Sequence, residues 1–131
     1  MPSTVAAVTF DCRDLDRLIE FWSAVLGYRL VDRGFSLDGT EYAQIKGDTG
    51  PPLMFEQVPK GGRRPEKNPV HLDLDPPPGE HAAEVERIIG LGARRAEVGL
   101  DPRLPWVVLL DPEDNEFCVI DHDRNEPTVN G

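Results

Sequence analysis

The sequence is poor in the residues that define several large classes of protein. It has only 2 cysteines among 131 residues, too few for a disulfide-stapled secreted scaffold. No apolar run approaches the roughly 20 residues that a membrane-spanning helix needs. Positive charge is also scarce, with 14 Lys and Arg against 24 Asp and Glu, and the net charge is −10. Because such a balance repels phosphate backbones and anionic lipids, we expect neither nucleic-acid nor membrane binding.

The remaining composition is that of an ordinary globular protein. Its length suits one domain with a core of its own, and its 13 prolines and 12 glycines indicate many turns between short elements. The N-terminal residues show no basic region followed by an apolar stretch, so we expect a cytoplasmic protein without a secretory signal. Cys12 and Cys118 each lie in an apolar segment, which favours buried free thiols.

Hydrophobic periodicity divides the chain into two similar halves, each read as strand, helix and three more strands. In the first half we predict strands over 4–12, 28–32, 41–46 and 53–58, and a helix that begins after Asp14 and ends at Gly27. In the second half we predict strands over 69–75, 93–98, 104–110 and 116–121, and a helix over 79–91. We therefore expect one domain: module one over about 4–58, a basic linker 59–68, module two over about 69–121 and a polar tail 122–131.

The two halves align when Ala7 is placed over His71. A single βαβββ unit leaves one sheet face and one sheet edge bare, so two copies should pack together. The sequence thus predicts an α+β fold of two tandem βαβββ modules, with a curved mixed sheet around a central cleft. Each helix is expected to cover the sheet face that points away from the cleft.

The strand predicted over 69–75 carries the strongest candidates for chemistry. Apolar and polar residues alternate there, so His71 and Asp73 share the polar face. Alternation along the strand predicted over 53–58 likewise places Glu56 on the face toward the cleft. An imidazole beside carboxylates can act as a general base at neutral pH, which makes His71 and Glu56 the candidate catalytic residues.

Other residues predicted to face the cleft are candidates for ligand binding: Thr9, Asp73, Trp106 and Cys118. For Trp106 a place in the core is the alternative. No nucleotide-binding, zinc-protease or serine-hydrolase motif occurs. Catalysis, ligand binding and a purely structural role all remain open for the His71 face.

The chain resembles the vicinal-oxygen-chelate superfamily, in particular its glyoxalase-like and bleomycin-resistance-like proteins. The resemblance is carried by these segments: Asp14-Leu15, Phe21-Trp22, Leu26-Gly27-Tyr28, His71-Leu72-Asp73-Leu74, Leu91-Gly92-Ala93, and Leu110 through Phe117. It implies the paired βαβββ modules, a small-molecule ligand and a homodimer.

The resemblance also implies four positions for metal ligands, one on the first and one on the last strand of each module. They fall on Ala7, Glu56, His71 and Cys118, of which only Glu56 and His71 carry a suitable oxygen or nitrogen ligand. We therefore expect no metal cofactor of the family type. If a divalent metal is bound, Glu56 and His71 are the expected ligands.

The sequence thus suggests a glyoxalase-like protein that binds a small organic molecule in the inter-module cleft. As an enzyme it would be a lyase or isomerase with a degenerate metal site, working by acid–base catalysis. The alternative is a non-catalytic binding protein that sequesters a drug-like molecule.

Overall fold

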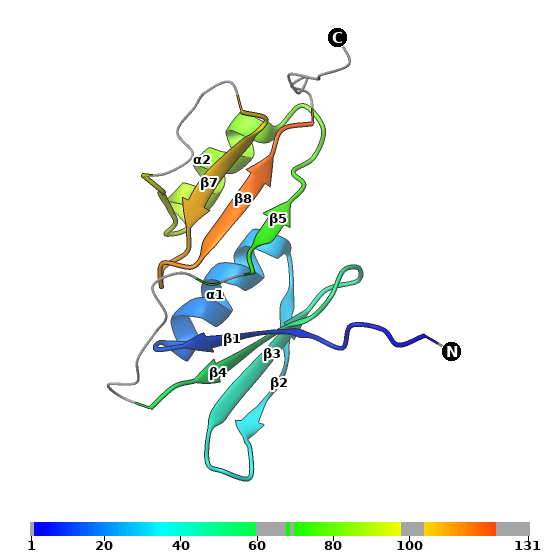
Figure 1. Ribbon diagram of the computed structural model, residues 1–131, viewed down its shortest axis with the longest axis vertical. Coiled ribbons are helices and arrows are strands. Elements are labelled where there is room, and N and C mark those ends of the chain that lie inside the picture. Colours follow the sequence, from blue (N-terminus) through cyan, green and yellow to red (C-terminus); the bar gives the residue numbers. More distant parts are fainter. Residues whose placement is uncertain (1, 60–67, 69, 98–103, 123–131) are drawn as a thin grey trace. The chain divides into compact units, whose positions relative to one another are not determined.

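The computed structural model describes residues 2–59, 68, 70–97 and 104–122 (Figure 1). The chain divides into two compact units, Met1–Arg64 and Pro65–Gly131. Within the described residues each unit contains one helix and one four-stranded mixed sheet, which confirms the predicted α+β fold of two βαβββ modules. The basic part of the predicted linker, 60–67, and the tail from 123 onward lie outside the described residues. No helix in the described ranges is long and apolar enough to cross a membrane.

The first unit is built from β1 (Val8–Cys12), α1 (Leu15–Leu26), β2 (Arg29–Phe35), β3 (Glu41–Lys46) and β4 (Leu53–Gln57). The sheet order is β1-β4-β3-β2, with β1 parallel to β4 and the other pairs antiparallel. The first strand begins at Val8 rather than at residue 4, because pairing with β4 begins at Leu53. Conversely, β2 runs past its predicted end, because its pairing with β3 continues to Phe35 and Glu41.

Helix α1 begins and ends as its sequence predicts. The Asp14 carboxylate accepts a hydrogen bond from the Arg17 backbone N–H at 3.1 Å, which satisfies one of the free donors of the first turn. Gly27 closes the helix with a left-handed φ of 68°, a conformation that glycine adopts without steric cost. The apolar stripe includes Trp22, which is fully buried and contacts the rings of Phe10 and Phe21 edge to face. This packing fixes α1 on one face of the first sheet.

The second unit is built from β5 (Leu72–Leu74), α2 (His81–Gly90), β6 (Arg94–Arg95), β7 (Trp106–Leu110) and β8 (Glu116–Ile120). Its order, β5-β8-β7-β6, repeats that of the first unit, again with the outer pair β5 and β8 parallel. The strand predicted over 69–75 is reduced to three residues, because only Leu72–Leu74 pair with β8. His71 consequently lies immediately before β5 and not within it.

A buried carboxylate holds the turn between β7 and β8. The Asp111 side chain is 0% exposed. Its Oδ1 accepts hydrogen bonds from the backbone N–H groups of Glu113 and Asn115 at 2.8 and 3.0 Å. Its Oδ2 accepts one from the Asn115 side-chain amide at 2.9 Å. These bonds fix where β8 begins, and so they set which of its residues lie opposite β5 and β7.

Candidate functional site

The two faces of the second sheet differ in character. Leu109, Phe117 and Val119 are almost fully buried, and α2 contacts β8 on their side. Side chains alternate along a strand, so Cys118 and Trp106 point to the opposite face, where both are partly exposed. We call this opposite side the open face of the second unit. Cys118 therefore lies on the sheet face away from α2, and its predicted place in an inter-module cleft stays a prediction.

Three polar side chains converge on the open face. Asp73 and Cys118 are direct partners in the parallel pairing of β5 and β8. His71 Nε2 lies 3.2 Å from Asp73 Oδ1, and the two side chains are 50% and 59% exposed. One ligand atom from each of His71, Asp73 and Cys118 lies within 4.8 Å of the other two. We call these residues the His71 cluster.

The surroundings of Cys118 hold its thiol in the protonated form. Its pKa is raised to about 11, mainly by burial, then by the negative charge of Asp73, by a hydrogen bond to that carboxylate and by Glu116. At neutral pH the thiol therefore acts as a weak hydrogen-bond donor toward Asp73. The free protein has no ready thiolate nucleophile at this position.

Apolar side chains surround the polar cluster. In the pairing of β7 with β8, Val108 lies opposite Cys118 and Trp106 lies opposite Ile120. All four are of intermediate burial. Trp106 is thus on the same face of the sheet as the cluster. The open face combines an apolar floor with a few convergent polar groups, the usual composition of small-molecule sites.

The first unit carries the other two predicted residues, Thr9 and Glu56. Thr9 is exposed and pairs with Met54, whereas Glu56 pairs with Asp11 and Tyr42. Glu56 also borders a cavity of about 410 Å³, lined by Ser36, Asp38, Thr40, Tyr42, Met54 and Glu56. Thr9 and Glu56 therefore share the sheet face away from α1.

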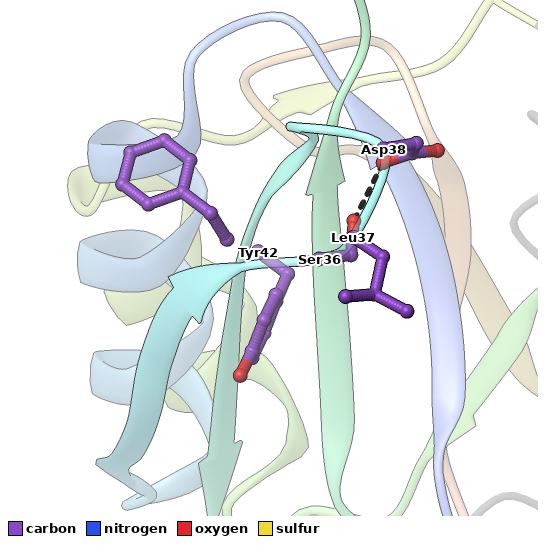
Figure 2. Close-up of a pocket in the computed structure, with 5 residues that line it drawn as sticks. Ser36, Leu37, Asp38 and Tyr42 are labelled. Atoms are coloured by element: carbon purple, nitrogen blue, oxygen red, sulfur yellow. Dashed lines mark hydrogen bonds between the residues drawn. The ribbon is translucent and has the colours of Figure 1, made fainter.

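A second hollow, of about 590 Å³, lies at the turn between β2 and β3 (Figure 2). There Ser36 Oγ donates a hydrogen bond to Asp38 Oδ1 at 2.7 Å, and the Thr40 backbone N–H donates another at 2.9 Å. These bonds lower the pKa of Asp38 to about 2. The hydrogen bond from Ser36 makes the largest contribution. Exposed Leu37 and the Tyr42 ring line the same hollow. The sequence carries no signal for this site, because residues 33–40 fall between two predicted strands and show no periodic pattern.

Strand register shows which residues of the two modules correspond. Val8 pairs with Leu53 in the first unit, and Leu72 pairs with Phe117 at the same sequence spacing in the second. With Ala7 placed over His71, Thr9 therefore corresponds to Asp73 and Met54 to Cys118. Glu56 lies two residues beyond Met54 on β4, on the same face of the sheet. The first module thus carries alanine, threonine and methionine where the second carries the His71 cluster.

Comparison with known proteins agrees with this architecture. A sequence model of the glyoxalase-like domain matches residues 7–120. The chain belongs to the glyoxalase-like domain family, within the vicinal-oxygen-chelate superfamily. Among curated proteins, none matches this glyoxalase-like chain.

Solved structures share the fold of this glyoxalase-like chain at low sequence identity. The fosfomycin resistance protein FosX from Mesorhizobium loti is 20% identical, with 92% of this chain and 93% of that chain covered and a TM-score of 0.68. A glyoxylase/bleomycin resistance protein/dioxygenase domain from Frankia sp. EAN1pec is 21% identical, with 92% and 98% covered and a TM-score of 0.70. FosX from Listeria monocytogenes, complexed with Mn(II) and 1S,2S-dihydroxypropylphosphonic acid, is 15% identical, with 92% and 93% covered and a TM-score of 0.70.

The residues of this chain do not fit an oxygen-preferring metal of the kind held in that FosX complex. Ala7 has no ligand atom, and the position that matches Cys118 in the first module is the thioether of Met54. Cys118 itself offers sulfur, a ligand that suits Zn²⁺ but not Mn²⁺ or Mg²⁺.

Proposed function

We propose that this protein binds a small organic molecule on the open face of its second unit. One observation carries the proposal: the His71 cluster and the partly exposed Trp106 share one sheet face. His71 and Asp73 would anchor polar groups of the ligand, and Trp106 would contact its apolar part. A large aromatic surface beside a few polar groups favours binding by shape with a defined orientation.

The polar groups of the cluster suit a ligand with neighbouring oxygen atoms. The imidazole of His71 and the thiol of Cys118 can donate hydrogen bonds, and the Asp73 carboxylate can accept them. A carbonyl beside a hydroxyl, or two adjacent hydroxyls, would match this mixed set. The relatives support a ligand of this size, since the FosX structure from Listeria monocytogenes holds a dihydroxypropylphosphonic acid.

A thermal-shift screen in the presence of chelator tests the proposal. The compounds are dicarbonyls, catechols, thiol conjugates and antibiotics. A ligand at 100 times its Kd should stabilise the protein by about 2.7 kcal/mol. We expect the shift to be largely lost in His71→Ala and Trp106→Ala, because each removes a contact to the ligand.

His122→Ala is the matched control for that screen. His122 forms a similar exposed pair, with its Nε2 2.5 Å from Asp75 Oδ1, but it is not part of the cluster. This variant should keep the full shift. A compound that stabilises His71→Ala and Trp106→Ala as much as the unmodified protein would contradict the proposal, as would the failure of every compound class.

Acid–base catalysis on the bound molecule is the second candidate function. The 3.2 Å contact between His71 Nε2 and Asp73 Oδ1 favours it, because a carboxylate at one ring nitrogen orients the imidazole and leaves the other nitrogen to take a proton. The reaction would be that of a lyase or isomerase. Mass spectrometry of each hit after incubation tests this. For an enzyme, His71→Ala should slow turnover by about 10²–10⁴, and unchanged compounds would leave the non-catalytic binding function.

Glu56 and Thr9 are tested with the same compounds. Glu56 is the second predicted catalytic residue, and Thr9 a predicted ligand contact. If Glu56 takes part in proton transfer, Glu56→Gln should lower turnover without weakening binding. Thr9→Ala should weaken binding alone. Unchanged kinetics and affinity in both variants would assign the function to the second unit only.

We further propose that the protein forms a homodimer. Strand β2 lies at the edge of the first sheet, and it and the following turn expose four large apolar side chains: Leu30, Val31, Phe35 and Leu37. An edge strand with exposed apolar residues favours association with a second chain. Light scattering after size-exclusion chromatography should give twice the chain mass, and Phe35→Ser with Leu37→Ser should shift it to one chain. A monomer at all concentrations would refute the dimer.

A further inference from the structure

We propose that the first unit has a binding site of its own for a small organic cation, a protonated primary amine with an apolar body. The site is the cavity of about 410 Å³ beside the turn between β2 and β3. The ammonium group would lie between the carboxylates of Asp38 and Glu56 and against the ring of Tyr42. This site is separate from the open face of the second unit, and no metal ion takes part in it.

The size and lining of the cavity suit a small amphipathic molecule. Asp38 and Glu56 give it a polar side, and the Tyr42 ring and the Met54 thioether give it an apolar one. Its volume lies within the range of roughly 300–1,000 Å³ that is usual for small-molecule sites. It shares Ser36, Asp38 and Tyr42 with the neighbouring hollow (Figure 2). The four apolar residues assigned to the proposed dimer contact do not line it, so the site does not depend on the oligomeric state.

The Glu56 carboxylate is a partly buried negative charge without a partner. Glu56 is of intermediate burial, yet it makes no hydrogen bond and no ion pair within the described part of the chain. Its neighbour on β1 is Asp11, a second acid, and its neighbour on β3 is Tyr42. Removal of a carboxylate from water is unfavourable unless a donor or an opposite charge compensates it. A ligand that brings both, such as an ammonium group, would supply that compensation.

Asp38 adds a second negative charge in a fixed orientation. Its Oδ1 accepts the hydrogen bonds from Ser36 Oγ and from the Thr40 backbone N–H. These bonds hold its pKa at about 2, so Asp38 stays ionised at neutral and mildly acidic pH. None of the six described residues that line the cavity is Lys, Arg or His. A positively charged ligand is therefore the electrostatic complement of this cavity.

The Tyr42 ring forms an aromatic wall and favours an organic cation over a hydrated metal ion. Tyr42 pairs with Gly34 of β2, and a Cβ atom added at Gly34 would lie 3.3 Å from the Tyr42 hydroxyl oxygen. The end of the ring thus lies against the bare backbone of a glycine. An aromatic face attracts ammonium groups through its quadrupole. A primary ammonium also has three N–H donors for the carboxylates, which a quaternary ammonium lacks.

Three probes that share a phenylalkyl body and differ in the head group test the inference. They are 2-phenylethylamine, 2-phenylethanol and 3-phenylpropionate, which present an ammonium, a hydroxyl and a carboxylate. Each is titrated in chelator at neutral pH into the full ¹⁵N-labelled chain, and binding is followed by nuclear magnetic resonance. We expect the amine to shift the amide signals of residues 36–42, Met54 and Glu56, and to bind roughly tenfold more tightly than the alcohol. The carboxylate should not bind, and added salt should weaken the amine.

Variants of the two acids identify the groups that hold the ammonium. Asp38→Asn and Glu56→Gln each remove one charge and keep the side-chain shape, so each should weaken the amine by roughly tenfold and leave the alcohol unchanged. Asp48→Asn is the matched control. The Asp48 side chain is 98% exposed and does not line the cavity, so this variant should keep full affinity.

Two variants of Tyr42 test the aromatic wall. Tyr42→Phe keeps the ring face and should keep amine binding, whereas Tyr42→Leu should weaken it. Circular dichroism establishes that each variant is folded, and Glu56→Gln gives a second route should Asp38→Asn alter the turn. Equal affinity for the amine and the alcohol would overturn the inference, as would amine binding that is unchanged in both carboxylate variants. Neither result bears on the ligand of the second unit, whose test uses His71 and Trp106.

Discussion

Replacing Asp73 by asparagine should make the Cys118 thiol more reactive in the metal-free protein. The pKa of this thiol is raised from 9.0 to about 11, first by burial, then by the charge of Asp73 and the hydrogen bond to it, and last by Glu116. Only the thiolate is alkylated. At pH 8 the raised pKa therefore lowers the reactive fraction by about a hundredfold.

The asparagine side chain keeps the shape of Asp73 and removes its charge. Because burial remains, we expect alkylation of Cys118 to accelerate several-fold but by less than a hundredfold. The assay is the rate of reaction with iodoacetamide at pH 8 in chelator, followed by peptide mapping. Cys12 is 0% exposed and should stay unlabelled, which makes it an internal control.

Glu116→Gln is the matched variant for this experiment. Glu116 makes the smallest of the four contributions to the raised pKa, so its removal should accelerate alkylation less than Asp73→Asn does. Two results would contradict a raised pKa of the Cys118 thiol that depends on Asp73. One is alkylation of unmodified Cys118 at the rate of a free exposed cysteine. The other is an unchanged rate in Asp73→Asn, which would mean that the carboxylate does not act on the thiol.

Three further predictions concern stability. Hydrogen bonds from Ser36 and Thr40 lower the pKa of Asp38 from 3.8 to about 2, so its contribution to stability is present above pH 4 and lost as the pH falls through 2. Asp38→Asn should therefore flatten the thermal-stability profile between pH 4 and 2, and an unchanged profile would contradict this. Gly27→Ala should cost about 1 kcal/mol in urea unfolding, because φ is 68° there; a neutral effect would contradict the helix ending. Asp111→Ala should cost about 3 kcal/mol in the same assay, because it leaves buried donors of the turn unpaired; a loss below 1 kcal/mol would contradict its anchoring role.

Local signals predicted much of the fold. Helix α1 follows from its apolar stripe between the Asp14 cap and Gly27, and the bounds of β3 match the predicted 41–46. The buried positions of Phe117 and Val119 follow from simple alternation. The bounds of β1 and β5 were not predictable in this way, because a strand extends only as far as its neighbour pairs with it.

The candidate site was only partly predictable for the same reason. His71 and Asp73 are two residues apart, so their shared face can be read from the sequence. Their proximity to Cys118 depends on the parallel pairing of β5 with β8, which joins distant segments and leaves no local pattern. Likewise, the register of β1 with β4 matches Cys118 to Met54, whereas sequence reasoning had considered Glu56 for the first module.

Binding of the ligand to the open face of the second unit can be located residue by residue in solution. Nuclear magnetic resonance of the ¹⁵N-labelled chain, titrated with the best compound from the screen, tests it most directly. If the ligand binds there, shifted amide signals should cluster at His71 and β5 (Leu72–Leu74), at β7 (Trp106–Leu110) and at β8 (Glu116–Ile120). Shifts centred on other segments, with these three strands unaffected, would contradict it.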